Sequence, residues 1–187
     1  MRPNSRKSAC VHSVHIYERD CDLMSRLCAV TSTSLRLGDA VLIVATPEHR
    51  DDLVRSLVDT GVNVRQCVRE GRYVMLDARE ALSTFMHEGW PDRNRFVSAM
   101  GSTLDAVRRR AQNGSYAMTV FGEMVAILWY AGKKEAALEL ERLWNEVISE
   151  RGFHLHCAYP RNLFQNEEEI YAVHAVHTHV MPESSAA

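Results

Sequence analysis

The stretch DAVLIVATPEH (residues 39–49) decides the fold class of this chain. Its first part is a continuous run of apolar, largely β-branched residues, so both faces of the expected strand must be covered, as in the middle of a parallel sheet. Thr46, Pro47 and Glu48 then suit the N-cap, the first position and the first turn of a helix. The stretch therefore predicts a buried parallel strand over residues 39–46 that leads directly into a helix.

Strands and helices alternate on both sides of this stretch. We expect strands over residues 12–18, 39–46, 73–78, 115–122 and 153–160, and a short extra strand over 62–68. We expect helices over residues 22–36, 47–60, 78–89, 93–112, 122–132, 133–152 and 166–177. This order predicts one α/β domain of three layers, a mostly parallel sheet with helices on both faces. The domain should span residues 12–182, between a flexible tail over 1–11 and a second tail over 183–187.

Composition narrows the function classes. Among the 187 residues, 46% are hydrophobic and 25% are charged, as in globular proteins, and the net charge of -2 favours neither nucleic acid nor an anionic membrane. The basic run Arg108–Arg110 falls in the last turn of an expected helix, where it suits the helix dipole as a solvated face. The start of the chain lacks the apolar block of a secretory signal. We therefore expect a cytoplasmic protein that contacts neither a membrane nor nucleic acid directly.

The carboxyl ends of the expected strands are the predicted ligand site, because open parallel sheets bind ligands there. The first strand-to-helix turn, YERDCD (17–22), has three carboxylates and no glycine or lysine. GxGxxG and GxxxxGK[ST] are absent from the chain, so we expect no phosphate-binding loop. Aromatic, acidic and sulfur-bearing residues at the other strand ends are typical of a small-molecule pocket. The predicted ligand-binding residues are His15, Tyr17, Glu18, Glu123, Cys157, Tyr159 and His177.

Other roles for these residues remain open from the sequence alone. FHLHCAYP (153–160) and HAVHTH (174–179) could supply a zinc site from His154, Cys157 and His177. On a strand, however, His154 and Cys157 point to opposite faces. A reactive Cys157 thiolate with His177 or His15 as its base is a second alternative, and Glu123 is either a helix cap or a polar anchor for a ligand. Structural roles are commoner for such residues, so we predict no metal, no cofactor and no catalytic residue.

Six segments follow one another in an order that resembles one family. They are HSVHIYE (12–18), LRLGDAVLIVATPEHRDDLVRSLVDTGVNV (35–64), GRYVMLDAREALSTFM (71–86), FGEMVAILWYAGKKEAALELERLWN (121–145), FHLHCAYP (153–160) and VHTHVMP (176–182). Together they resemble the MEDS family, the methanogen/methylotroph, DcmR-like sensory domain. The resemblance covers nearly the whole of residues 12–182.

The resemblance implies a degenerate relative of RecA-like ATPases, with a RecA/P-loop-like sheet, that senses small organic molecules in bacterial and archaeal signalling. A chain of this length should act through a partner, such as a histidine kinase or a transcription regulator. The family's characteristic positions match His15, Tyr17, Gly122, Glu123, Glu141, Trp144, Asn145, Cys157, Tyr159, Pro160 and His177. We therefore expect a non-catalytic sensory domain. The alternatives are a degenerate nucleotide-binding protein or ATPase, and a ligand-free scaffold that works as a homo-oligomer.

Overall fold

A six-stranded parallel sheet forms the centre of the computed structural model, which describes residues 10–112 and 117–181. Its strands, in sequence order, are β1 (His12–Tyr17), β2 (Ala40–Ala45), β3 (Tyr73–Asp77), β6 (Met118–Gly122), β7 (His154–Pro160) and β8 (His179–Val180). The spatial order is β3-β2-β6-β7-β1-β8, and every recorded pairing within this sheet is parallel. The predicted tail over 183–187, most of the tail over 1–11, and the predicted strand start at 115–116 lie outside the described residues.

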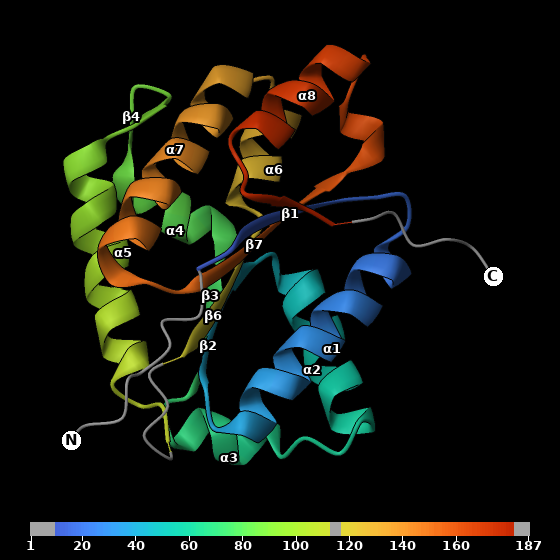
Figure 1. Cartoon of the computed structure of the whole chain (residues 1–187), viewed down its shortest axis with the longest axis vertical. Coiled ribbons are helices and arrows are strands. Elements are labelled where there is room, and N and C mark those ends of the chain that lie inside the picture. The colour runs from blue at the N-terminus through green and yellow to red at the C-terminus, as the bar shows by residue number, and fades with distance from the viewer. Residues whose placement is uncertain (1–9, 113–116, 182–187) are drawn as a thin grey trace, which may run out of the picture.

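Helices cover both faces of the sheet and complete three layers (Figure 1). One face carries α1 (Asp20–Leu37), α2 (Pro47–Asp59) and α3 (Val64–Arg69). The other face carries α4 (Ala78–Phe85), α5 (Arg93–Arg108), α6 (Met124–Tyr130), α7 (Lys134–Arg151) and α8 (Glu167–Ala175). The predicted three-layer α/β arrangement is therefore confirmed.

Residues 39–49 fold as their composition predicts. All six residues of β2 are fully buried, with Val41 and Ile43 packed toward α1 and α2, and Leu42 and Val44 packed toward the opposite helices. Each fully buried side chain of this kind contributes about 1.5–3 kcal/mol of hydrophobic stabilisation. Helix α2 then begins at Pro47, as predicted. Because both faces of β2 are apolar, each face packs against one of the two helical layers.

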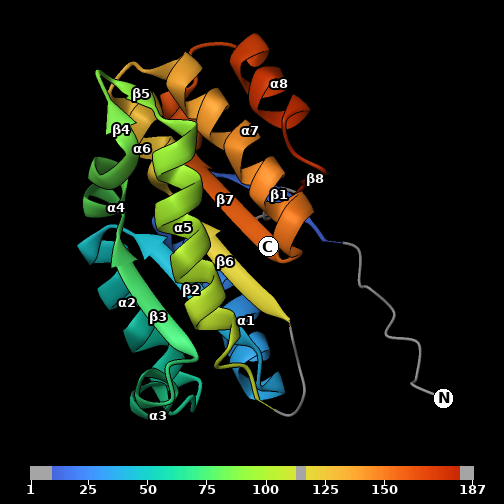
Figure 2. The same ribbon diagram turned by 90° about the vertical axis from the view of Figure 1, so that its left-hand side faces the viewer.

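Two predicted elements are wrong. Residues 62–68 contain the helix α3 and no strand, because the Asn63 side chain caps the helix by accepting the Gln66 N–H at 3.1 Å. The helix predicted over 78–89 ends at Phe85. A small hairpin of β4 (Met86–His87) and β5 (Trp90–Pro91) follows, as Figure 2 shows. Its two turn residues, Glu88 and Gly89, both have positive φ angles, which suits a two-residue hairpin turn.

The C-terminal segment returns to the sheet edge, which the sequence did not predict. Helix α8 ends at Ala175, and the short strand β8 pairs with β1. The Thr178 N–H donates to the His12 carbonyl, and the Met181 N–H donates to the Val14 carbonyl, both at 2.9 Å. Residues 177–181 therefore run along β1, and β8 becomes the edge strand of the sheet.

Two further features concern surfaces. Arg108 is only half exposed, because its guanidinium donates to the carbonyls of Arg151 and Gly152 at the end of α7. The solvated face predicted for Arg108–Arg110 is therefore wrong at Arg108 and right at the exposed Arg109 and Arg110. Across residues 10–112 and 117–181, the helices are too short or too polar to cross a bilayer.

Candidate functional site

Strand alternation divides the predicted pocket residues between the two faces of the sheet. On β1, His15 and Tyr17 point toward α1, whereas on β7, Cys157 and Tyr159 point toward α7. Glu18 is exposed at the end of β1. The other six predicted residues fall into three separate groups: Cys157, Tyr159 and His177 in a buried network on the α7 face, His15 and Tyr17 beside α1, and Glu123 in a polar corner at the strand ends.

The buried network is centred on Glu141, which is fully enclosed on the inner side of α7. One carboxylate oxygen, Oε1, accepts the Tyr159 hydroxyl at 2.8 Å. The other, Oε2, accepts the Cys157 thiol at 3.3 Å and lies 3.2 Å from Nε2 of His12. His177 completes the group, with its Nε2 atom 3.4 Å from Oε1. Four segments far apart in the sequence thus meet at one carboxylate.

The two histidines of this network are oriented by their outer nitrogens. Nδ1 of His12 lies 2.8 Å from Oδ1 of Asn145, whose own amide donates to the Val176 carbonyl at 2.8 Å. Nδ1 of His177 donates to the Val173 carbonyl at 2.7 Å. Each Nε2 atom is therefore turned inward, and the two rings lie 4.2 Å apart between centroids. Nε2 of His177 makes no hydrogen bond within the described structure.

Electrostatics follow from this burial. Burial alone disfavours an ionised Glu141, but the positive charge of His177 and the hydrogen bond and charge of His12 outweigh it and hold the Glu141 pKa well below its usual range. Burial lowers the His177 pKa, and the Glu141 carboxylate more than reverses that, so the net shift is upward. Burial and the Glu141 charge raise the pKa values of Cys157 and Tyr159 far above their ordinary ranges. Cys157 is therefore a neutral thiol here, which argues against a reactive thiolate.

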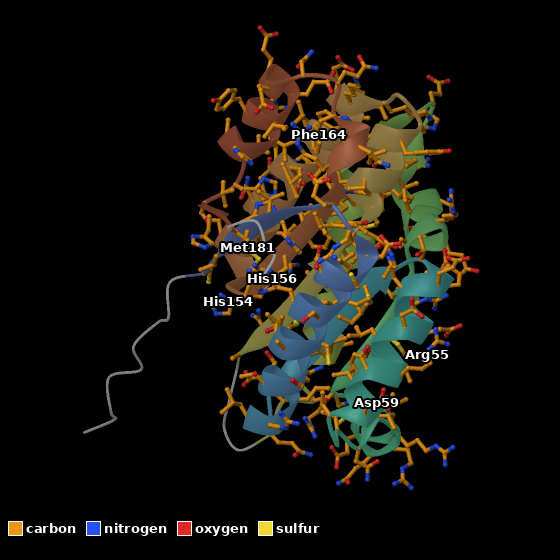
Figure 3. All side chains as sticks on the ribbon, turned by 90° about the vertical axis from the view of Figure 1, so that its right-hand side faces the viewer. Arg55, Asp59, His154, His156, Phe164 and Met181 are labelled. Carbon is orange, nitrogen blue, oxygen red and sulfur yellow. The ribbon has the colours of Figure 1, made fainter. Side chains whose placement is uncertain are left out.

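The second group lines a groove between α1 and the sheet, which we call the α1 groove. Its lining residues are His15, Leu23, Arg26, Leu27, Val30, Phe121, His156, Cys157, Ala158 and Met181. Figure 3 shows His156 of β7 and Met181 of the C-terminal segment on this side of the molecule. The lining is mostly apolar, with polar atoms supplied by two histidines and one arginine. This composition is typical of a site for small, weakly polar molecules.

Both groove histidines are uncharged at neutral pH. Burial, reinforced by the nearby Arg26, lowers the His15 pKa to about 4, and Asp22 opposes this only in part. Burial and the neighbouring His154 lower the His156 pKa to about 4 as well. Nδ1 of His156 is satisfied by the Ser13 hydroxyl at 2.6 Å, whereas Nδ1 of His15 is buried and has no hydrogen-bond partner in the described structure.

The third group lies at the carboxyl ends of β2 and β6. Glu123 accepts the Thr46 N–H with one oxygen and lies 2.6 Å from Nδ1 of His49 with the other. That hydrogen bond, opposed by burial, raises the His49 pKa. Glu123 occupies the N-cap position of α6 without capping it, so of the two interpretations left open for Glu123, helix cap is wrong. The Glu123 carboxylate therefore links the end of β6 to the end of β2.

The predicted zinc ligands are only partly brought together. His154 lies on the α1 side of β7, opposite Cys157, as the strand alternation indicated (Figure 3). Cys157 and His177 do meet, but their companions are His12 and Glu141. Sequence reasoning missed His12, and it noted Glu141 only as a matching position. The sequence did contain a signal for Glu141. This glutamate lies at helical spacing from the apolar residues Ala137, Trp144 and Ile148, which predicts that its side chain is buried with theirs.

A family model described as "MEthanogen/methylotroph, DcmR Sensory domain" matches residues 11–178, which is most of the chain. No curated protein matches the sequence. The match extends over β1, α7, β7 and the His177 turn, so the network and the α1 groove both lie almost entirely inside it.

Proposed function

Since the chain belongs to the MEDS family of sensory domains, we propose that it binds a small, uncharged organic molecule in the α1 groove and signals to a partner protein. The observation that carries this proposal is the His15 Nδ1 atom, which is buried, lines the groove and has no hydrogen-bond partner there. A buried polar atom without a partner costs about 1–3 kcal/mol, which a ligand hydrogen bond would recover.

The groove sets the chemistry of the ligand. Its neutral histidines and apolar walls disfavour a charged molecule, since transfer of an ion from water is costly. About 20 Å³ is open to the centres of water-sized molecules, and roughly 10–15 Å³ suffices for one water. A larger organic molecule therefore has to displace a wall of the groove, and Met181 and Val30 are two of its partly exposed apolar parts.

That displacement offers a route for the signal. Met181 belongs to the segment that pairs with β1 through two short hydrogen bonds at Thr178 and Met181. The adjacent residues His179 and Val180 are exposed on the edge strand β8. A ligand with different affinities for the docked and displaced forms of this segment would shift their populations. A cytoplasmic partner, such as a histidine kinase or a transcription regulator, would recognise one of the two forms.

The proposal also includes a non-catalytic role and a RecA-like origin. The protonated Cys157 thiol and the absence of a phosphate-binding loop support the first. The parallel sheet between helical layers supports the second. A RecA-like relative would hold phosphate at the carboxyl ends of these strands. Here Asp20 and Glu123 both lie beside His49, and Glu18 follows β1, so carboxylates would repel a phosphate.

Thermal unfolding with a panel of short alcohols, ketones and amides tests the proposal. We expect at least one compound to raise the melting temperature of the wild-type chain and to have no effect on Val30→Trp, which fills the groove. Ala29→Trp, one position away on the exposed side of α1, is the matched control and should respond like wild type. A higher melting temperature in the presence of ATP and magnesium would favour the nucleotide-binding alternative instead. Unchanged melting with every compound, together with a stable oligomer in light scattering, would favour the scaffold.

A further inference from the structure

The buried network on the α7 face has the composition and spacing of a metal site. We infer that His12, Glu141, Cys157 and His177 together bind a zinc ion. Each residue offers one ligand atom, and these four atoms all lie within 4.8 Å of one another. Imidazole nitrogen, thiolate sulfur and carboxylate oxygen are the ligands that zinc uses in proteins, whereas magnesium and calcium prefer oxygen alone.

Four contacts within the network are close to the spacing of ligand atoms around a tetrahedral zinc ion. Zinc–ligand bonds of about 2.0–2.3 Å place neighbouring ligand atoms roughly 3.3–3.7 Å apart. In this network, Nε2 of His12 lies 3.2 Å from Oε2 of Glu141 and 3.4 Å from Sγ of Cys157. Sγ of Cys157 lies 3.3 Å from Oε2 of Glu141, and Nε2 of His177 lies 3.4 Å from Oε1. Small rotations of the side chains would suffice to surround an ion.

The outer contacts of the histidines provide an independent argument. Metal-binding histidines commonly donate their second ring N–H to an oxygen, which fixes the ring and its tautomer. His12 has Oδ1 of Asn145 at 2.8 Å from its Nδ1 atom, and His177 has the Val173 carbonyl at 2.7 Å. Both Nε2 atoms consequently face the centre. The Nε2 atom of His177 is buried, makes no hydrogen bond within the described structure and lies 3.4 Å from Oε1 of Glu141, so it can serve as a ligand atom.

Charge balance also favours the ion. Zinc with one thiolate, one carboxylate and two neutral imidazoles carries no net charge, so its burial avoids the cost of an unpaired ion. The ion would take the place of the thiol proton that Cys157 now donates to Glu141, and that proton would leave to solvent. Four protein ligands fill the tetrahedron and leave no open position, which defines a structural site.

The site would fasten the C-terminal segment to the core. His177 lies in the turn between α8 and β8, whereas its companions come from β1, α7 and β7. Zinc would therefore hold the start of residues 177–181, the same segment that forms one wall of the α1 groove. Loss of the ion should free this segment without removing the sheet beneath it.

The first experiment measures metal content. Because the ligands are enclosed, the reduced chain is unfolded with a chelator, refolded with Zn²⁺ or Co²⁺, and desalted. We expect one ion per wild-type chain and a rise in melting temperature of about 5–10 °C at free zinc a hundred times Kd. The Co²⁺ form should show the visible bands of a tetrahedral site and a sulfur-to-cobalt charge-transfer band.

Variants assign the ion to this network. Cys157→Ser should keep the fold and lose the charge-transfer band, and His177→Asn should lose the ion. His154→Asn, on the opposite face of β7, is the matched control and should bind as wild type does. Asn145→Ala should weaken binding by about 10–100-fold, because it releases the His12 ring. In wild type, zinc should also slow amide exchange at Thr178 and Met181.

Two results would overturn the inference. One is a folded wild-type chain that retains no zinc and shows no shift in melting temperature after refolding with it. The other is equal retention of zinc by wild type and His177→Asn, since the ion would then be held by other residues. If a variant does not fold, the wild-type metal content and the cobalt charge-transfer band decide by themselves.

Discussion

The Tyr159 hydroxyl donates to the Glu141 carboxylate at 2.8 Å, and this bond joins the last long strand of the sheet to the inner side of α7. Both residues are fully buried. A buried, ionised carboxylate is stable only while its hydrogen-bonding and charged partners are present. The packing of α7 on the sheet therefore depends on Glu141 and its partners.

Replacement of Glu141 should therefore be costly. We expect Glu141→Ala to lower the free energy of unfolding by about 3–5 kcal/mol, because it leaves Tyr159, Cys157 and two histidines without their common acceptor. Urea unfolding in the presence of a chelator measures this cost without any contribution from metal. Glu146→Ala, on the exposed side of α7 where Glu146 pairs with Arg93, should cost about 0–1 kcal/mol. Equal effects of the two variants would contradict the account of the network.

The corner carboxylate Glu123 should matter for a different reason. Glu123→Ala removes the acceptor of the Thr46 N–H and of His49, so we expect a loss of about 1–3 kcal/mol. Glu18→Ala, at the exposed end of β1, should change the free energy of unfolding by no more than about 0.5 kcal/mol. Chemical denaturation of the two variants side by side checks this prediction, which fails if Glu18 proves the more important of the two.

The Asp77 side chain caps the start of helix α4. Asp77 accepts the N–H groups of Arg79 and Glu80 at 2.9 and 3.0 Å, and its other oxygen lies 3.2 Å from Arg50. We expect Asp77→Ala to lower the free energy of unfolding by about 0.5–2 kcal/mol, and Asp77→Asn by less, since asparagine also caps. Thermal unfolding of both variants tests this, and equal losses would indicate that the ion pair with Arg50 outweighs the cap.

Protonation of His15 should destabilise the fold in mild acid. Its pKa is about 4 in the folded chain and about 6.5 in an unfolded one, so the unfolded state binds more protons between these values. The stabilisation from neutral His15 is therefore complete above pH 6.5 and is lost as the pH falls toward 4. Allowing for screening near the groove, we expect this loss to be about 1–2 kcal/mol.

Denaturant unfolding of wild type and His15→Phe at several pH values measures the His15 contribution. The variant should lose less stability than wild type between pH 6.5 and 4. His87→Phe, which alters an exposed histidine of the hairpin, should follow the wild-type curve. Identical pH dependence in His15→Phe and wild type would show that His15 is not held neutral by the fold.

The sequence predicts elements and faces better than it predicts the site. The buried run over 39–46 and the helix start at Pro47 both appear in the structure, because they depend on local chemistry and on burial of both strand faces. The predicted strand over 62–68 fails, since four apolar residues in a short run fit either period and the Asn63 cap decides for a helix.

The pocket prediction separates into three groups for a geometric reason. Strand ends collect residues at one edge, but alternation still divides their side chains between two faces. The His15 side chain faces α1, whereas the Cys157 side chain faces α7 and donates to Glu141, although Cys157 also borders the α1 groove. His12 and Glu141 were not joined to Cys157 because the contact depends on how α7 lies across the strands, which periodicity does not specify. The short strand β8 was missed because two residues carry no pattern.

Ligand binding in the α1 groove is central to the proposed sensory role, and the methyl groups of methionine report on it directly. In a chain labelled at its methionine methyls, the short alcohols, ketones and amides can be titrated while Met181, a wall of the groove, is followed by NMR. Met118 is buried on the opposite face of the sheet and serves as the internal control. We predict that at least one compound shifts the Met181 signal saturably, leaves Met118 in place, and loses its effect in Val30→Trp. A Met181 signal that no compound moves, or that moves equally in Val30→Trp, would contradict the proposed sensory site.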